Sequence, residues 1–70
     1  MIIVMEIQKD AEVSTIVTAH ETRNDAENKY HTILAYAAVS NVPMHSAVMF
    51  RDDGRFIKTE SFEHQVQNNE

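Results

Sequence analysis

Four histidines are the side chains in this sequence best suited to chemistry: His20, His31, His45 and His64. Imidazole binds transition metals and exchanges protons near neutral pH. Metal sites, however, usually combine histidines at short helical or strand spacings with a carboxylate, and none of the four falls into such a motif. Glu27 and His31, one helical turn apart, offer two ligands at most. The sequence therefore predicts that His31 and His64 are solvated, that His45 is a polar residue on a strand face, and that there is no metal site and no cofactor.

Nucleophilic catalysis has no support either. The chain has no cysteine and a single glycine, Gly54, so it can build neither a thiolate site nor a glycine-rich phosphate loop. Asp52 and Asp53 form a carboxylate pair, but directly before a glycine Asp is typical of a turn. We expect no catalytic residue and no enzymatic activity.

The charge balance disfavours two further classes of partner. Six Lys and Arg oppose eleven Asp and Glu, which gives a net charge of -5 that repels nucleic acid and anionic membrane surfaces. No apolar stretch approaches the roughly 20 residues of a membrane span. The absence of cysteine is typical of a reducing compartment. We expect a cytoplasmic protein that does not act on nucleic acid or membranes.

A helix over residues 24–39 is the clearest element. Asn24 can cap it, and Glu27 stands three residues later as in a capping box. Apolar residues then recur at the spacing of one buried face. These are Ala26, Tyr30, Ile33, Leu34 and Ala37. The segment Ser40 to Pro43 ends the helix, because a residue that precedes proline avoids the helical conformation.

Alternating and β-branched residues predict strands on both sides of this helix. The strands are expected at residues 2–8, 13–21, 44–51 and 55–62. The order strand, strand, helix, strand, strand predicts an α+β fold, ββαββ, with a four-stranded antiparallel sheet and one helix packed on one face. A single domain is expected over residues 1–64, with a flexible C-terminal tail at 65–70.

Apolar side chains are expected on both faces of this sheet. In the first strand Ile3, Met5 and Ile7 make one face wholly apolar. In the last hairpin, Asp53-Gly54 favours a two-residue turn that sets Phe50 opposite Ile57. That register groups Met44, Val48, Phe50 and Ile57 on one face, and Met49, Ala47, Phe56 and Phe62 on the other.

One helix covers only one face of such a sheet, so something else is expected to cover the other. A chain of this size also buries only about 60% of its unfolded surface, which makes oligomerisation a common source of stability. We expect a homodimer, by sheet stacking or by edge pairing, with Met49, Phe56 and Phe62 in its interface. The alternative is that these are scattered surface residues, which are common.

Several short segments of the chain form a pattern that is found together elsewhere. In order they are AENKYHTILA from Ala26, AAVS from Ala37, VP at Val42, HSAVM from His45, DG at Asp53, IK at Ile57 and SFEH from Ser61. In these segments the chain resembles a group of small hypothetical proteins encoded in phage-like and mobile regions of gut Firmicutes. The resemblance spans most of the chain. It carries no assigned catalytic residue, and it implies a phage-type protein in a host cytoplasm that acts by binding.

Two functions fit that context. The first is an anti-defence inhibitor, or a sponge for a nucleotide signal, that binds a host protein or small ligand as a homo-oligomer. Such a pocket could use Tyr30, His31, His45 and Lys58 for stacking, hydrogen bonding and charge. The alternative is a structural or accessory phage protein that acts through self-assembly.

Overall fold

The computed structural model describes residues 1–64, so the tail predicted at 65–70 lies outside the described residues. The elements are β1 (Ile2–Lys9), β2 (Val13–His20), α1 (Arg23–Val39), β3 (Met44–Arg51) and β4 (Phe56–Glu63). Their order and pairing confirm the predicted ββαββ fold with a four-stranded antiparallel sheet.

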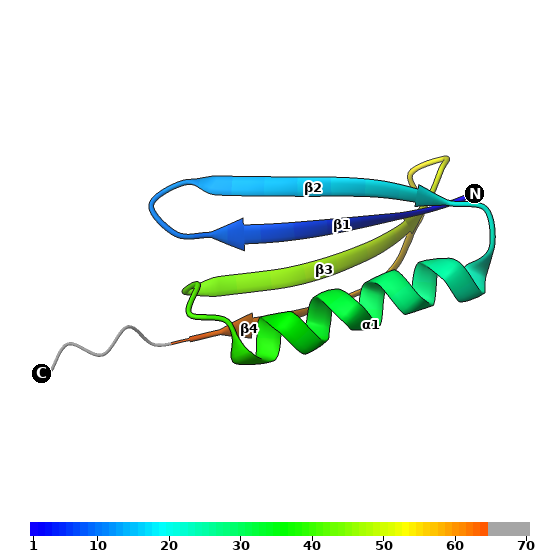
Figure 1. The fold of residues 1–70 in the computed structure, drawn as a ribbon. Helices are drawn as coiled ribbons and strands as arrows, with labels where there is room; N and C mark the ends of the chain where they lie inside the picture. The colour runs from blue at the N-terminus through cyan, green and yellow to red at the C-terminus, as the bar shows by residue number, and fades with distance from the viewer. Residues whose placement is uncertain (65–70) are drawn as a thin grey trace, which may run out of the picture.

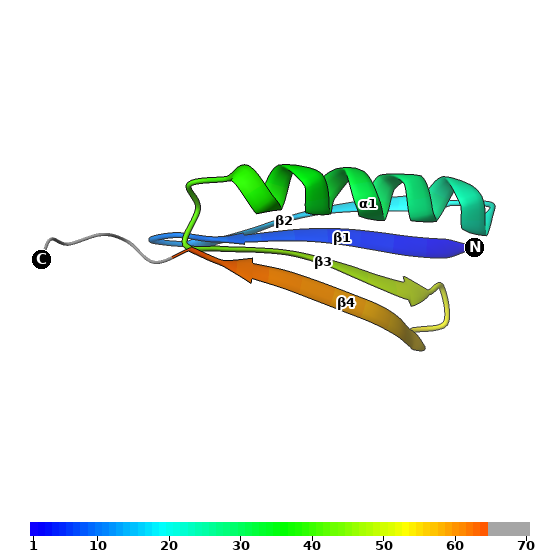
Figure 2. The ribbon, with the colours of Figure 1, turned by 90° about the horizontal axis from the view of Figure 1, so that it is seen from below.

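The sheet is built from two hairpins joined side by side. The strand order is β2-β1-β3-β4, so β1 and β3 form the central pair and β2 and β4 are the edges. The helix α1 runs along one face of the sheet (Figure 1), and the view turned by 90° shows the other face without a covering element (Figure 2). Among residues 1–64, no helix has the length and apolarity needed to cross a bilayer.

The start of α1 differs from the prediction. Thr22, in an extended conformation, is the N-cap, and its hydroxyl accepts a hydrogen bond of 3.2 Å from the backbone N–H of Asp25. Asn24, the predicted cap, lies inside the first turn instead. Both residues are good caps in isolation, so the sequence signal allowed either position. The predicted end of the helix is confirmed, with Ser40 as the C-cap.

The core lies between α1 and the two central strands. Val4, Ala47 and Met49 are wholly buried there beneath α1. The helix contributes four of its five predicted face residues as buried side chains, whereas Leu34 is only partly buried at the margin. The buried four are Ala26, Tyr30, Ile33 and Ala37.

The last hairpin turns through three residues rather than two. Arg51 and Arg55 are joined by a backbone hydrogen bond of 2.7 Å across the loop Asp52 to Gly54. Gly54 takes a φ of 93°, a left-handed conformation that glycine adopts without strain. Phe50 therefore pairs with Phe56, and not with Ile57 as predicted.

A β-bulge then restores the predicted register. The pairing shifts by one residue between Met49 and Phe50, which leaves Ile57 unpaired and sets Lys58 opposite Met49. The faces predicted for Phe56 and Ile57 were therefore wrong. Ile57 packs against the core under α1, while Phe56 shares the uncovered face with its partner Phe50.

The grouping of Met49 with Phe56 and Phe62 also needs correction. Met49 has no exposed surface because it lies in the core beneath α1. Phe62 pairs with His45, whose row lies on the same side of the sheet as Met49, and it is half-buried there. Of the three predicted interface residues, only Phe56 lies on the uncovered face.

Candidate functional site

Three of the four predicted binding residues meet around the carboxylate of Glu27. Lys58 Nζ, from β4, donates to Glu27 Oε1 at 2.8 Å, and the same ammonium lies 4.8 Å from the centre of the Tyr30 ring. His31 Nε2 lies 3.3 Å from Glu27 Oε1, one helical turn along α1. Arg23 Nε donates to Oε2 at 2.8 Å. The cluster therefore joins the first turns of α1 to β4.

The charges in this cluster satisfy one another. The hydrogen bond from Lys58, followed by that from Arg23, lowers the pKa of Glu27 to about 2, against 4.5 for a free glutamate. Burial raises the pKa of Tyr30, and the nearby carboxylates of Glu60 and Glu27 add to that effect. Glu27 accepts hydrogen bonds from several donors, and Lys58 contacts both a carboxylate and an aromatic ring. These contacts hold the helix against the sheet.

The fourth predicted binding residue lies elsewhere. His45 is buried on β3, and its Nε2 donates a 2.6 Å hydrogen bond to Glu6 Oε2 on β1. Gln8 Nε2 donates to the same oxygen at 3.0 Å. His45 Nδ1 is buried with no hydrogen-bond partner among the described residues. His45 thus belongs to a buried polar pair, apart from the Glu27 cluster.

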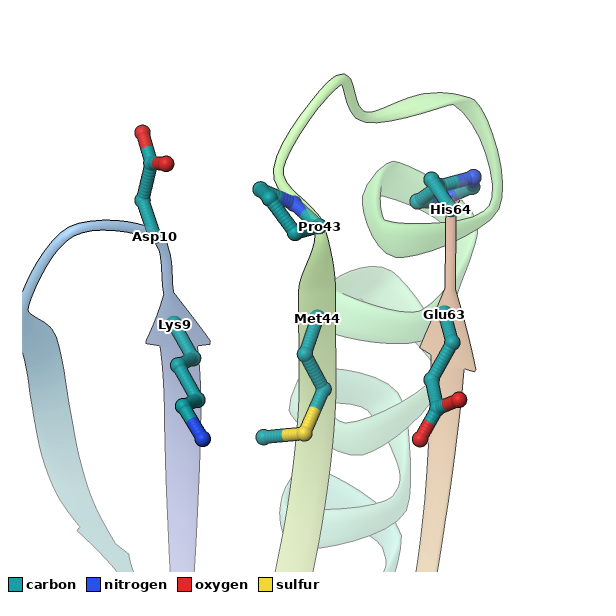
Figure 3. Close-up of a pocket in the computed structure, with 6 residues that line it drawn as sticks. All are labelled: Lys9, Asp10, Pro43, Met44, Glu63 and His64. Atoms are coloured by element: carbon teal, nitrogen blue, oxygen red, sulfur yellow. The ribbon is translucent and has the colours of Figure 1, made fainter. Parts of the chain in front are cut away.

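A shallow hollow of about 330 Å³ lies at the end of the sheet opposite the Asp52 to Gly54 loop. Its lining residues are Lys9, Asp10, Pro43, Met44, Glu63 and His64 (Figure 3). Lys9, Met44 and Glu63 are cross-strand partners on three neighbouring strands, and their side chains lie side by side with Met44 between the two charges. The hollow holds none of the predicted binding residues.

The uncovered side of the sheet, here called the open face, is the more apolar of the two. Strand alternation and register place on it every second residue of each strand, those on the side away from α1. Its large apolar side chains are Ile3, Met5, Ile7, Val13, Val17, Met44, Val48, Phe50 and Phe56. Phe56 is 65% exposed and Val17 is 57% exposed.

The side that α1 covers, here called the helix face, carries several polar groups instead. Glu6, Gln8 and Thr18 lie on it from the first hairpin, and Lys58 and Glu60 from the last. Antiparallel sheets normally bury the apolar face and expose the polar one. This chain buries its core beneath α1 but also carries large apolar side chains on the other face, which makes the open face the feature most in need of a partner.

The sequence carried a signal for this surface that the interface prediction did not use. The alternation in β1 marked Ile3, Met5 and Ile7 as a wholly apolar face. They line the middle of the open face, beside Val48 and Phe50 of β3. The predicted interface was taken from the last hairpin alone, where the bulge changes the faces.

Comparison with known protein families, with curated proteins and with solved structures finds no match to this chain. Within residues 1–64 there is also no group of three or more side chains placed to hold a metal ion. The candidate site therefore rests on the geometry of the open face.

Proposed function

We propose that this protein is a noncatalytic binding protein that works through the open face of its sheet and assembles as a homodimer by stacking two such faces. One observation carries the proposal: the open face bears apolar side chains on β1, β2 and β3, interrupted at Thr15, Ser46 and Lys9, and α1 covers the opposite face. Apolar surface of this extent is favourable to bury, and in soluble proteins it marks an interaction site.

The size of the open face suits a small dimer. Four strands about 4.8 Å apart, with eight residues at about 3.3 Å each, give a face of roughly 500 Å² per copy. Two stacked faces would therefore bury about 1,000 Å², the lower bound for a specific interface. The stacked form would be a β-sandwich with a helix on each outer side.

Stacking is favoured over edge pairing by the same apolar residues. Pairing through the edge strand β2 or β4 would satisfy backbone groups but leave Met5, Val48 and Phe50 in water. Stacking removes them from water and needs no change in the strands. The dimer is also the simplest closed assembly, since one self-complementary surface is sufficient.

The contacts of the Glu27 cluster and of the buried His45–Glu6 pair favour self-assembly over a ligand sponge. Lys58 and Tyr30 already contact each other, and Lys58 is bound to Glu27. His45 is buried against Glu6. A ligand that used these groups would first have to break those contacts. A self-assembling accessory protein is also one of the two classes that the resemblance to phage-type proteins suggests.

Sedimentation velocity over a concentration series tests the proposal. We expect a dimer for the wild type, and for Phe56→Asp a dissociation constant at least ~10-fold higher, because an interface would have to bury the new charge. Tyr36→Asp is the matched control, since Tyr36 is 67% exposed on α1 and so lies away from the open face. Circular dichroism shows whether each variant keeps the fold.

Two results would contradict the proposal. The first is a wild type that stays monomeric up to millimolar concentration. The second is equal weakening of the dimer by Phe56→Asp and Tyr36→Asp, which would place the interface elsewhere or make the effect one of net charge.

A further inference from the structure

The two ends of the open face differ in chemistry. At the end near the Asp52 to Gly54 loop, Ile3, Phe50 and Phe56 form one cross-strand row that is wholly apolar. At the opposite end the corresponding row runs across all four strands as Val13, Lys9, Met44 and Glu63. One face thus carries an aromatic row at one end and a row with two opposite charges at the other.

The two charges in the second row do not meet within one chain. Met44 lies between them on the central strand β3, and the side chains of all three run side by side (Figure 3). Strands are about 4.8 Å apart, so Lys9 and Glu63 are separated by two strand spacings. Among the described residues, neither one takes part in an ion pair.

This pattern distinguishes the ways in which two copies can stack. A two-fold axis across the strands sets the aromatic row of one copy on the charged row of the other, so Lys9 lies over Ile3 and Glu63 over Phe56, and neither charge meets an opposite one. A two-fold axis along the strands sets aromatic row on aromatic row. It also reverses the strand order, so β1 of one copy lies over β3 of the other and β2 lies over β4. Lys9 then lies over Met44 of the other copy, one strand spacing from the Glu63 of that copy.

We infer that two copies stack about a two-fold axis parallel to the strands, and that Lys9 of each copy forms an ion pair with Glu63 of the other. The inference rests on the dimer proposed above and adds its orientation and two residues that set it. Stacked sheets lie about 10 Å apart, and the one-strand offset brings the backbones of Lys9 and the other copy's Glu63 to about 11 Å, a gap that an extended lysine and glutamate side chain span together. Because the row is at the end of the face, the ammonium and carboxylate keep contact with water.

Such pairs select the orientation more than they strengthen the dimer. Ion pairs at the rim of an interface contribute little affinity, but like charges placed there disfavour the wrong alignment. The apolar residues of the open face supply the affinity, and the charged row decides which end meets which.

A charge-swap series tests this pairing by sedimentation. Lys9→Glu and Glu63→Lys each set like charges against each other, and we expect each to raise the dimer dissociation constant ~10-fold, with most of the affinity regained in the double variant. Lys29→Glu, on α1, and Glu21→Lys, in the loop before α1, change net charge by the same amounts away from the open face. We expect neither control to change the dissociation constant.

Cross-linking gives a second, direct readout. A carbodiimide joins an amine and a carboxylate in contact, so a mixture of unlabelled and ¹⁵N-labelled protein would yield a Lys9–Glu63 peptide with one light and one heavy half. Links within one chain give only all-light or all-heavy peptides, and mass spectrometry separates the two classes.

The outcomes separate this inference from the proposed function. A wild-type dimer whose affinity is unchanged in both single variants, or is not regained in the double variant, overturns the pairing while the dimer stands. A wild-type dimer that yields no mixed-label Lys9–Glu63 peptide overturns the axis and the pairing. A monomeric wild type removes both proposals.

Discussion

His45 and Glu6 form a hydrogen bond of 2.6 Å between Nε2 and Oε2, on neighbouring central strands beneath α1. The two side chains are 5% and 15% exposed, so the contact is nearly sealed from water. A buried donor and acceptor are costly to leave unpaired, while replacing both with apolar groups is often neutral. The stability of the helix face is therefore expected to depend on keeping both partners of this pair or neither.

Replacing one partner is expected to destabilise the protein more than replacing both. Glu6→Leu leaves the His45 N–H unpaired and should lower the free energy of unfolding by about 1–3 kcal/mol. The double variant Glu6→Leu/His45→Leu should recover most of that loss. Urea unfolding at one fixed protein concentration measures it, because dimerisation makes stability depend on concentration. Equal losses in the single and double variants would contradict the pairing.

The Glu27 cluster predicts a pH dependence of stability. The folded-state pKa of Glu27 is about 2, below the value of 4.5 for the free group, so the native state holds the carboxylate ionised. Its contribution is complete above about pH 4.5 and is lost as the pH falls from there towards 2.

Glu27→Gln removes this contribution, so the stability difference between wild type and variant should shrink as the pH falls through that window. Urea unfolding at intervals from pH 7 to pH 2 follows the difference. Glu21→Gln is the control, since Glu21 is exposed and precedes α1. A stability difference between wild type and Glu27→Gln that stays constant down to pH 2 would contradict the hydrogen bonds assigned to the Glu27 carboxylate.

Two neighbouring residues of α1 should respond differently to truncation. Ile33 is 3% exposed in the core, whereas Leu34 packs only partly against it. Ile33→Ala should cost about 2–5 kcal/mol, and Leu34→Ala about 1–2 kcal/mol, because a partly exposed site loses less burial and leaves no closed cavity. Thermal or urea unfolding of both variants provides the test, and the reverse order would mean that the helix is rotated on the sheet.

The position of the N-cap can be decided by a matched pair of alanine variants. Thr22→Ala removes the acceptor for the Asp25 N–H and should cost about 0.5–2 kcal/mol. Asn24→Ala lies within the first turn, where alanine is a better helix former, and should be neutral or slightly stabilising. A larger loss of stability for Asn24→Ala than for Thr22→Ala would show that Asn24 is the N-cap, as predicted from the sequence.

Most of the fold was open to prediction because periodicity is a strong local signal. The strand alternation and the spacing of Ala26, Tyr30 and Ile33 gave the element order and the buried stripe of α1. The last hairpin was harder, because Asp-Gly suits both a two-residue turn and a three-residue loop with glycine in the left-handed position. A difference of one residue exchanged the faces of Phe56 and Ile57.

The site was harder to predict than the fold for a related reason. Glu6 and Gln8 have the polar character of a solvent-facing strand side, yet they lie on the helix face. Which face a helix covers depends on the sum of many contacts, including those of Met49 and Ala47, and β3 is apolar on both sides. Tyr30, His31 and Lys58 were predicted to share a site, but the carboxylate of Glu27, which pairs with both His31 and Lys58, was not assigned to it.

The central pairing of β1 with β3 has a consequence for how the chain folds. Each hairpin joins strands that are close in sequence, and such local units form in about 1–10 μs. The seam between them pairs Ile2 with Arg51, and its backbone hydrogen bonds continue to Met1, whose carbonyl accepts from the Asp52 N–H at 3.2 Å. We therefore expect two preformed hairpins to dock in the slow step, with α1 as the connection that holds them at high local concentration.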